Sequence, residues 1–243
     1  MKMPRLATAA LIWGLCLALL RVAPANAADF EKGLKAANSG DFATALAEWQ
    51  PLAEQGDASA QFYLGQMYLL GKGVPQDNQA ALKWYTLAAE QGDAAAQFIL
   101  GGMYNEGLGV PQDDKTAVKW YTLSAEQGDA TAQNNLGTMY FQGNGVPQDY
   151  TESVKWYRLA AEQGDASAQF NLGEKYRQGK GVPQDNVLAY MWLLIVAVGE
   201  LEKTEEAYDL LNYLESNMSE SDISSAIQLA GTCVEQNFKG CQR

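Results

Sequence analysis

The chain has 243 residues, a formal net charge of −12 and no histidine. An acidic chain repels nucleic-acid phosphates, so we expect no nucleic-acid partner. The lack of histidine excludes Ser-His-Asp and Cys-His catalysis and removes the commonest protein ligand of zinc. We expect no catalytic residue, no metal and no other cofactor.

Residues 1–27 have the layout of a secretory signal peptide. Lys2 and Arg5 precede an apolar run over 6–20, and Ala25-Asn26-Ala27 is a typical cleavage pattern. The alternative is an uncleaved membrane anchor, but the apolar run is shorter than the roughly 20 residues that a span needs. We expect an exported protein, periplasmic or secreted, with no stable membrane span after cleavage.

A 36-residue repeat organises most of the remaining chain. The cluster G-V-P-Q-D begins at Gly73, Gly109, Gly145 and Gly181. A fixed period of this size is typical of a solenoid, whose units bury their apolar faces only against one another. We expect a diverged helix pair at 28–56, four repeats at 57–92, 93–128, 129–164 and 165–200, and a helical cap at 201–243.

Each repeat predicts two helices joined by a turn. In the first repeat, Asp57 is a good N-cap for a helix that ends at the glycines before Pro75, and Asp77 caps the second helix. The spacing of apolar residues predicts a core-facing stripe on this second helix. Trp84 should fill the space between neighbouring units, within a stripe formed by Ala81, Trp84, Leu87 and Ala88.

The two ends depart from the repeat. Two helices are expected near 29–38 and 41–54, with Trp49 at the position of Tyr85. The second helix of the fourth repeat is unusually apolar, with Met191 in place of a lysine. We expect it to be buried on two sides by the cap; the alternative is an exposed helix that docks a partner or a membrane. The cap should hold a helix near 202–216 and another starting at Ser219, with an apolar stripe of Ile223, Ala226, Ile227 and Ala230.

Cys233 and Cys241 are the two cysteines that would remain after signal cleavage. An even pair in an exported protein indicates a disulfide, here one that pins the C-terminal tail. The alternative is two free thiols.

At the repeats the chain resembles the Sel-one-like repeats, relatives of the tetratricopeptide repeats. The matching pattern is A-x-A-Q-x-x-L-G-x-M-Y-x-x-G-x-G-V-P-Q-D, followed by A-x-K-W-Y-x-L-A-A-E-Q-G, over residues 57–200. The resemblance implies a right-handed α-solenoid of two-helix repeats with helical caps at both ends. It also implies a curved surface for protein–protein contacts, in a family of scaffolds, adaptors and regulators with many exported bacterial members.

Comparing the repeats with one another separates folding positions from candidate binding positions. On the first helix of each repeat, the positions that vary step by three and four and therefore share one face. The resemblance places first helices on the concave side, so we predict a partner-binding face there; the alternative is solvated surface that varies freely. The predicted face consists of Tyr63, Gln66, Leu70, Ile99, Glu106, Asn135, Thr138, Gln142, Asn171, Glu174 and Gln178.

These observations favour a monomeric, non-enzymatic scaffold, adaptor or regulator that binds an envelope or extracellular protein. The amides of Asn135, Gln142, Asn171 and Gln178 would suit the backbone of an extended peptide. One alternative is a glycan- or peptidoglycan-binding protein that uses Tyr63. A hydrolase related to cysteine-rich β-lactam-binding repeat proteins has less support, because the S-x-x-K, S-D-N and K-T-G motifs are absent.

Overall fold

The computed structural model describes residues 28–199 and 203–241. The predicted signal peptide therefore lies outside the described residues. Within them the chain forms twelve helices and no strand. Their bounds are α1 Phe30–Asn38, α2 Phe42–Glu54, α3 Ala58–Leu70, α4 Asn78–Glu90, α5 Ala94–Glu106, α6 Asp114–Glu126, α7 Ala130–Gln142, α8 Tyr150–Ala161, α9 Ala166–Gln178, α10 Asn186–Val198, α11 Thr204–Glu215 and α12 Glu220–Glu235.

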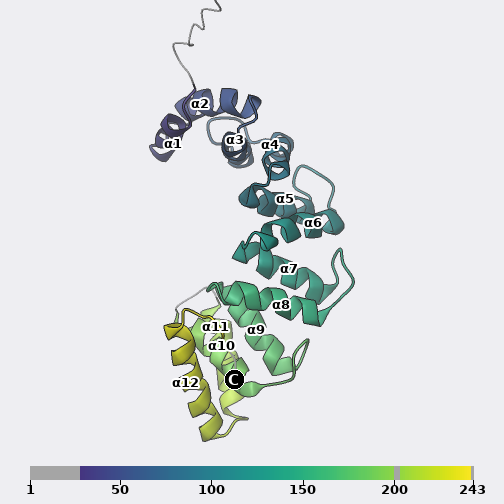
Figure 1. Cartoon of the computed structure of the whole chain (residues 1–243), viewed down its shortest axis with the longest axis vertical. Coiled ribbons are helices and arrows are strands. Elements are labelled where there is room, and N and C mark those ends of the chain that lie inside the picture. Colours follow the sequence, from purple (N-terminus) through teal and green to yellow (C-terminus); the bar gives the residue numbers. More distant parts are fainter. Residues whose placement is uncertain (1–27, 200–202, 242–243) are drawn as a thin grey trace, which may run out of the picture.

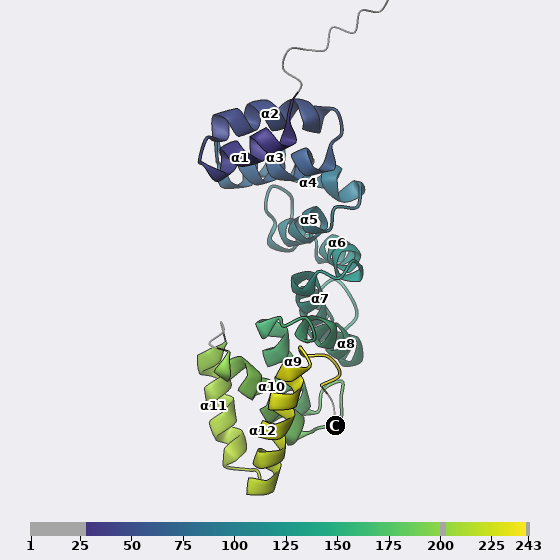
Figure 2. The same ribbon diagram turned by 60° about the vertical axis from the view of Figure 1, so that its left-hand side comes forward.

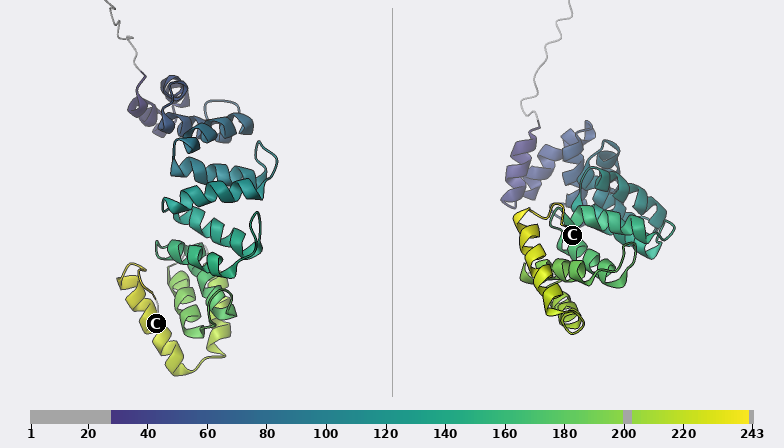
Figure 3. Two further views of the ribbon diagram at one scale, coloured as in Figure 1. Left: turned by 45° about the vertical axis from the view of Figure 1, so that its right-hand side comes forward. Right: turned by 60° about the horizontal axis from the view of Figure 1, so that its bottom comes forward.

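The helices stack in chain order into a curved column, as Figure 1 shows. From α1 to α10 each helix packs against the helix before it and the helix after it, which is the contact pattern of a solenoid. The first helices α3, α5 and α7 lie on the inner side of the curve, and α4, α6 and α8 lie on the outer side (Figures 1 and 3). The predicted all-α solenoid of two-helix repeats is confirmed.

Aspartates and glycines set the limits of the helices. Asp57 accepts a hydrogen bond from the backbone N–H of Ala60, and Gly71 ends α3 in the left-handed conformation at φ 66°. Gly145 is also left-handed, at φ 71°, and a Cβ there would collide with the backbone of Asp114 in the preceding repeat. The G-V-P-Q-D loop thus needs glycine for its backbone conformation and for its contact with the start of α6.

The core-facing stripe of the second helix contains Tyr85 and not Trp84. Tyr85 is fully buried, and a Cβ on Gly65 of α3 would lie 2.9 Å from its ring. Trp84 is half-buried and packs against the core of the preceding unit. The prediction that Trp84 lies in the buried stripe was wrong, because adjacent residues lie about 100° apart on a helix and Tyr85 takes the buried direction. The prediction that Trp84 fills space between neighbouring units is confirmed. The buried residues of α4 are Ala81, Tyr85, Ala88 and Ala89, and the burial of Ala89 places the centre of the stripe closer to Tyr85 than to Trp84. Trp49, which the sequence aligns with Tyr85, is also buried.

A pair of glutamines inside each of the first three repeats links the two helices. The buried Gln61 donates from Nε2 to the carbonyl of Ala53 at 3.0 Å, and its Oε1 accepts from Gln91 Nε2 at 2.7 Å. The same pairing joins Gln127 to Gln97 at 2.8 Å and Gln163 to Gln133 at 2.9 Å. Each pair satisfies a buried amide that would otherwise destabilise the repeat.

The cap covers α10 from two sides, as predicted. Both α11 and α12 pack on it, and Figure 2 shows them beside it. Met191 is 1% exposed. Ser219 caps α12 by accepting from the backbone N–H of Asp222. The predicted place of Ile227 in the apolar stripe was wrong: Ile227 is 51% exposed, because the buried stripe of α12 steps from Ala226 to Ala230 and Cys233.

Cys233, in the last turn of α12, forms a disulfide with Cys241 and so closes a short loop at the end of this helix. Asn237 and Phe238, inside this loop, adopt positive φ values of 54° and 63°. In the described part of the chain, no helix has both the length and the apolar character needed to cross a bilayer.

Candidate partner-binding face

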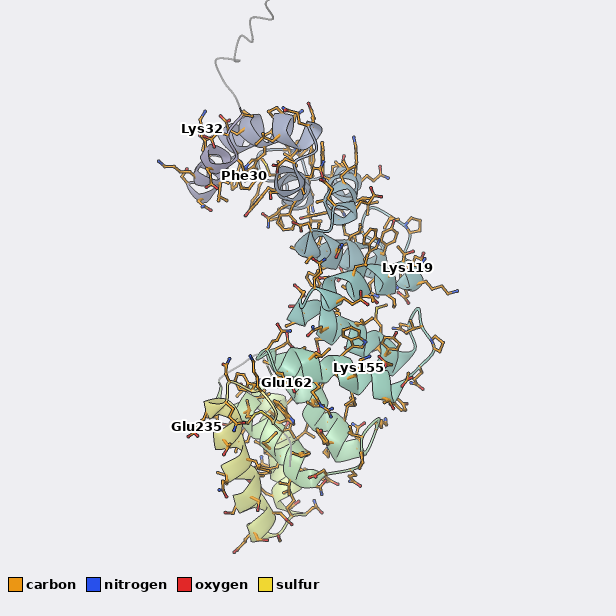
Figure 4. The ribbon with its side chains drawn as sticks, viewed as in Figure 1. Phe30, Lys32, Lys119, Lys155, Glu162 and Glu235 are labelled. Atoms are coloured by element: carbon orange, nitrogen blue, oxygen red, sulfur yellow. A yellow bond between two sulfur atoms is a disulfide. The ribbon has the colours of Figure 1, made fainter. Side chains whose placement is uncertain are left out.

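Nine of the eleven predicted residues of the first helices lie in three different environments, and Leu70 and Ile99 lie outside them. Four of them share a central hollow, two lie at an N-terminal hollow, and those of α9 are bonded to neighbouring side chains. Side chains such as Lys119 extend away from the outer side (Figure 4).

The central hollow lies between α5, α6 and α7 and has a volume of about 280 Å³. It brings together the predicted residues Glu106, Asn135, Thr138 and Gln142. Two consecutive repeats contribute to it, so the predicted face does run across the boundary between repeats here. The sequence prediction missed four further lining residues, namely Asn105, Tyr121, Met139 and Asn144.

The central hollow is lined mainly by amides and hydroxyls. Thr138 Oγ1 is hydrogen-bonded to the hydroxyl of Tyr157 at 3.0 Å, and Asn144 donates to Gln142 Oε1 at 2.8 Å. Burial raises the pKa of Tyr121, while a hydrogen bond with Asn135 opposes this shift. The phenol therefore stays neutral and can take part in hydrogen bonds at physiological pH.

Glu106 supplies the negative charge of the central hollow. It is exposed, and none of the ion pairs within residues 28–199 and 203–241 includes it. Its carboxylate is thus available to accept from a cationic group or an amide that enters the hollow.

The N-terminal hollow has a volume of about 160 Å³ and lies between α1, α2 and α3, with Tyr63 and Gln66 in its lining. The ring of Tyr63 stacks on Trp49 at a centroid distance of 4.7 Å and also packs 5.6 Å from Phe30. Most of the Tyr63 ring therefore contributes to packing between the first two units, and little of it remains for a ligand.

The remaining predicted residues are dispersed or already bonded. Leu70 is 52% exposed, whereas Ile99 packs against the core that α4 and α5 form between two repeats. Asn171 donates to Asn134 at 3.0 Å and so ties α9 to α7. Glu174 forms an ion pair with Arg177 at 2.7 Å and accepts from Gln178 Nε2 at 2.6 Å. A ligand at α9 would have to displace these bonds.

Lys175 is a buried cation that the variable-position comparison did not place on the face. It is 6% exposed, and its Nζ lies 3.5 Å from the centroid of the Phe141 ring. Burial lowers its pKa to about 8. The equivalent residues are Met67, Met103 and Met139, so the break in the methionine series was the available sequence signal.

No cluster of three acidic or cysteine side chains with the spacing of a metal site occurs in the region that the structure describes.

Comparison with known proteins identifies the repeats. Residues 58–93, 94–129, 130–165 and 166–195 match the model of the Sel1 repeat, so each match starts one residue later than the unit predicted from the sequence, and the fourth match ends at 195. A solved protective antigen of uropathogenic Escherichia coli strains, described as an SLR fold, is 32% identical with a TM-score of 0.78 over 87% of this chain and 46% of its own. A Sel1 repeat protein from Oxalobacter formigenes is 36% identical, with a TM-score of 0.65 over 75% of this chain and 54% of its own.

This chain thus spans about half the length of both solved relatives. No curated protein matches it.

Proposed function

The chain belongs to the Sel1 repeat family, and from that premise we propose that it is a non-enzymatic interaction module that binds a partner protein on its concave face. Proteins of this family are generally protein–protein interaction scaffolds. Repeat arrays bind through such extended curved surfaces, because the fold itself provides no single deep cleft.

The central hollow carries the proposal. Two consecutive repeats contribute variable polar residues to one concavity, and these positions hold other residue types in the other repeats. Asn135 and Gln142 offer both donors and acceptors, as the N–H and C=O groups of an extended peptide require. Glu106 favours a lysine, an arginine or an amide of the partner at the same place.

Three observations support an exported compartment for this interaction. The N-terminal sequence has the pattern of a signal peptide, and the Cys233–Cys241 disulfide fits an oxidising environment. The similar Escherichia coli protein is described as a protective antigen. We propose that the mature chain acts in the periplasm or outside the cell.

The glycan-binding alternative has less support. It depended on Tyr63, whose ring is engaged by Trp49 and Phe30. Retention of the purified chain on peptidoglycan, undiminished by variants of the central hollow, would favour this alternative over a protein partner.

Site-specific photocrosslinking tests the proposed face directly. A photoreactive amino acid replaces Gln142 in the hollow, and a matched variant carries it at Glu126, an exposed position on an outer helix. We expect a discrete crosslinked protein from Gln142 in intact cells and none from Glu126. Adding Glu106→Lys should abolish that crosslink without lowering the melting temperature. Equal crosslinking from both positions would contradict a concave binding face.

A further inference from the structure

A further concavity, separate from the central and N-terminal hollows, lies at the C-terminal end between α10 and α12. Its volume is about 680 Å³, within the range of pockets that bind ligands. One wall is Leu194, Ile195 and Val198 of α10, and the other includes Ile227 and Val234 of α12. Val198, Ile227 and Val234 are 69%, 51% and 52% exposed. We call this concavity the cap groove.

Departures from the repeat create the cap groove. The earlier second helices end in Glu-Gln, at positions 90–91, 126–127 and 162–163, whereas the fourth has Val198-Gly199. Gln91, Gln127 and Gln163 donate to the buried glutamine thirty residues earlier in the same repeat. In the fourth repeat that donor is replaced by Gly199, which has no side chain.

The loss of this donor leaves a buried acceptor at the floor of the cap groove. Gln169 is 1% exposed and lines the groove. Its Nε2 donates to the carbonyl of Ala161 at 3.2 Å, which fixes the orientation of the amide. Its Oε1 has no hydrogen-bond partner among the described residues. A buried acceptor without a donor is costly, so it favours a ligand that supplies an N–H.

The charges near the cap groove further restrict the kinds of ligand that it can bind. Glu235 is the only charged side chain among the described residues that line the groove. Figure 4 places Glu162 at the same end of the molecule. The Glu235 carboxylate in the lining and the negative net charge of the chain disfavour fatty acids and anionic lipid headgroups, and favour a neutral or basic ligand. The apolar walls require aliphatic or aromatic side chains.

We propose that the cap groove binds an apolar peptide segment of a partner protein, in which one amide or basic side chain donates to Gln169 Oε1. The partner side chain takes the place that Gln91, Gln127 and Gln163 occupy in the other repeats. The disulfide-closed loop after α12 borders this site, because Phe238 lines the groove and packs near Gly164.

The repeat supplies the test variant, Gly199→Gln. Gly199 has φ −73° and ψ −3°, close to the values of Gln91 and Gln127 at the same C-cap position, so glutamine fits without strain. The new side chain should pair with Gln169 and fill the floor of the groove. Its melting temperature should be equal to or above that of the wild type. Ile227→Thr, at an exposed position, weakens the wall without opening the core.

The probe is a fluorescent 15-residue amphipathic peptide with leucine at i, i+3, i+4 and i+7, lysine on its polar face and one glutamine within its apolar face. Two matched peptides carry leucine or glutamate in place of that glutamine. Fluorescence anisotropy with the full mature chain should give the tightest binding for glutamine, about tenfold weaker binding for leucine and the weakest for glutamate. Gly199→Gln should remove the preference, and Ile227→Thr should weaken all three.

Several results would overturn the proposal: equal affinity for the three peptides, an unchanged preference in Gly199→Gln, or binding of neutral phosphatidylcholine vesicles without binding of any peptide. Dimerisation of the wild type that Ile227→Thr abolishes would assign the groove to a second copy instead. Glu106→Lys should leave peptide binding here unchanged, so the result is independent of the concave face.

Discussion

Two tyrosines at the same repeat position should respond in opposite directions to loss of the hydroxyl. Tyr85 and Tyr157 occupy equivalent places, and both rings are buried. The hydroxyl of Tyr157 is hydrogen-bonded to Thr138 at 3.0 Å. The hydroxyl of Tyr85 is buried without a hydrogen-bond partner among the described residues. The substitutions Tyr85→Phe and Tyr157→Phe thus remove the same atom from two different environments.

The expected changes in the free energy of unfolding follow from these two environments. Tyr85→Phe removes an unsatisfied buried hydroxyl and should raise the free energy of unfolding by about 1 kcal/mol. Tyr157→Phe removes an existing hydrogen bond and should lower the free energy of unfolding by about 1 kcal/mol. Thr138 keeps a bond to the carbonyl of Asn134 at 3.1 Å, so its own hydroxyl is not left unsatisfied. The two variants should therefore differ by about 2 kcal/mol.

Urea denaturation of the mature chain measures the difference, with the m-value checked for each variant because repeat arrays can lose two-state behaviour. In thermal unfolding, each kcal/mol corresponds to roughly 2–4 °C for a chain of this size. If Tyr85→Phe destabilises the chain as much as Tyr157→Phe does, the Tyr85 hydroxyl is satisfied in solution and the reasoning fails.

Three further perturbations probe other parts of the fold. Gly145→Ala should lower the free energy of unfolding by about 3 kcal/mol or more, because it adds a collision with backbone atoms to the strain of the left-handed conformation. Gly128 is also left-handed but lies in open space, so Gly128→Ala should lower the free energy of unfolding by about 1–2 kcal/mol, measured by chemical denaturation. Lys175→Met should raise the melting temperature by about 3 °C at pH 7. Because the pKa of Lys175 is lowered to about 8 from 10.5, the unfolded wild type binds more protons than the folded wild type between pH 8 and pH 10.5. The stability of the wild type should therefore rise with pH over this range, and the increase in melting temperature caused by Lys175→Met should shrink by pH 10. An unchanged gain at pH 10 would refute that burial penalty. Cys241→Ser removes the disulfide, which closes a loop with a sequence separation of 8, and should destabilise the cap by about 2.5 kcal/mol. Faster hydrogen exchange in α12 measures this loss. Dithiothreitol should produce the same faster exchange in the wild type and leave the variant unchanged.

The fold was predictable because its information is local and repeated. The aspartate N-caps, the glycine turns and the 36-residue step each identify a helix boundary, and four copies confirm one another. The exact core stripe was less accessible, since Trp84 and Tyr85 are adjacent and both are large. Their packing depends on Gly65 of the partner helix, whose missing side chain makes room for the Tyr85 ring.

The candidate site was predictable only in part, because variability between repeats is an indirect sign of function. Variability between the repeats correctly identified four residues that share the central hollow, namely Glu106, Asn135, Thr138 and Gln142. It omitted Tyr121, because a tyrosine recurs there in three repeats and is therefore counted as structural. Comparing the repeats also included Glu174 and Gln178. Their mutual hydrogen bond, and the ion pair of Glu174 with Arg177, depend on rotamers that the sequence does not specify.

The cap groove shows why recurring positions also carry functional information. Gln61, Gln97, Gln133 and Gln169 are identical in the sequence, so comparison of the repeats treats all four as structural. Their environments differ only because the residue thirty positions later is glutamine in three repeats and Gly199 in the fourth. A fixed residue thus becomes a candidate ligand-binding group when its partner changes. Comparing repeats by bonded pairs, and not by single positions, would locate such sites in other repeat arrays.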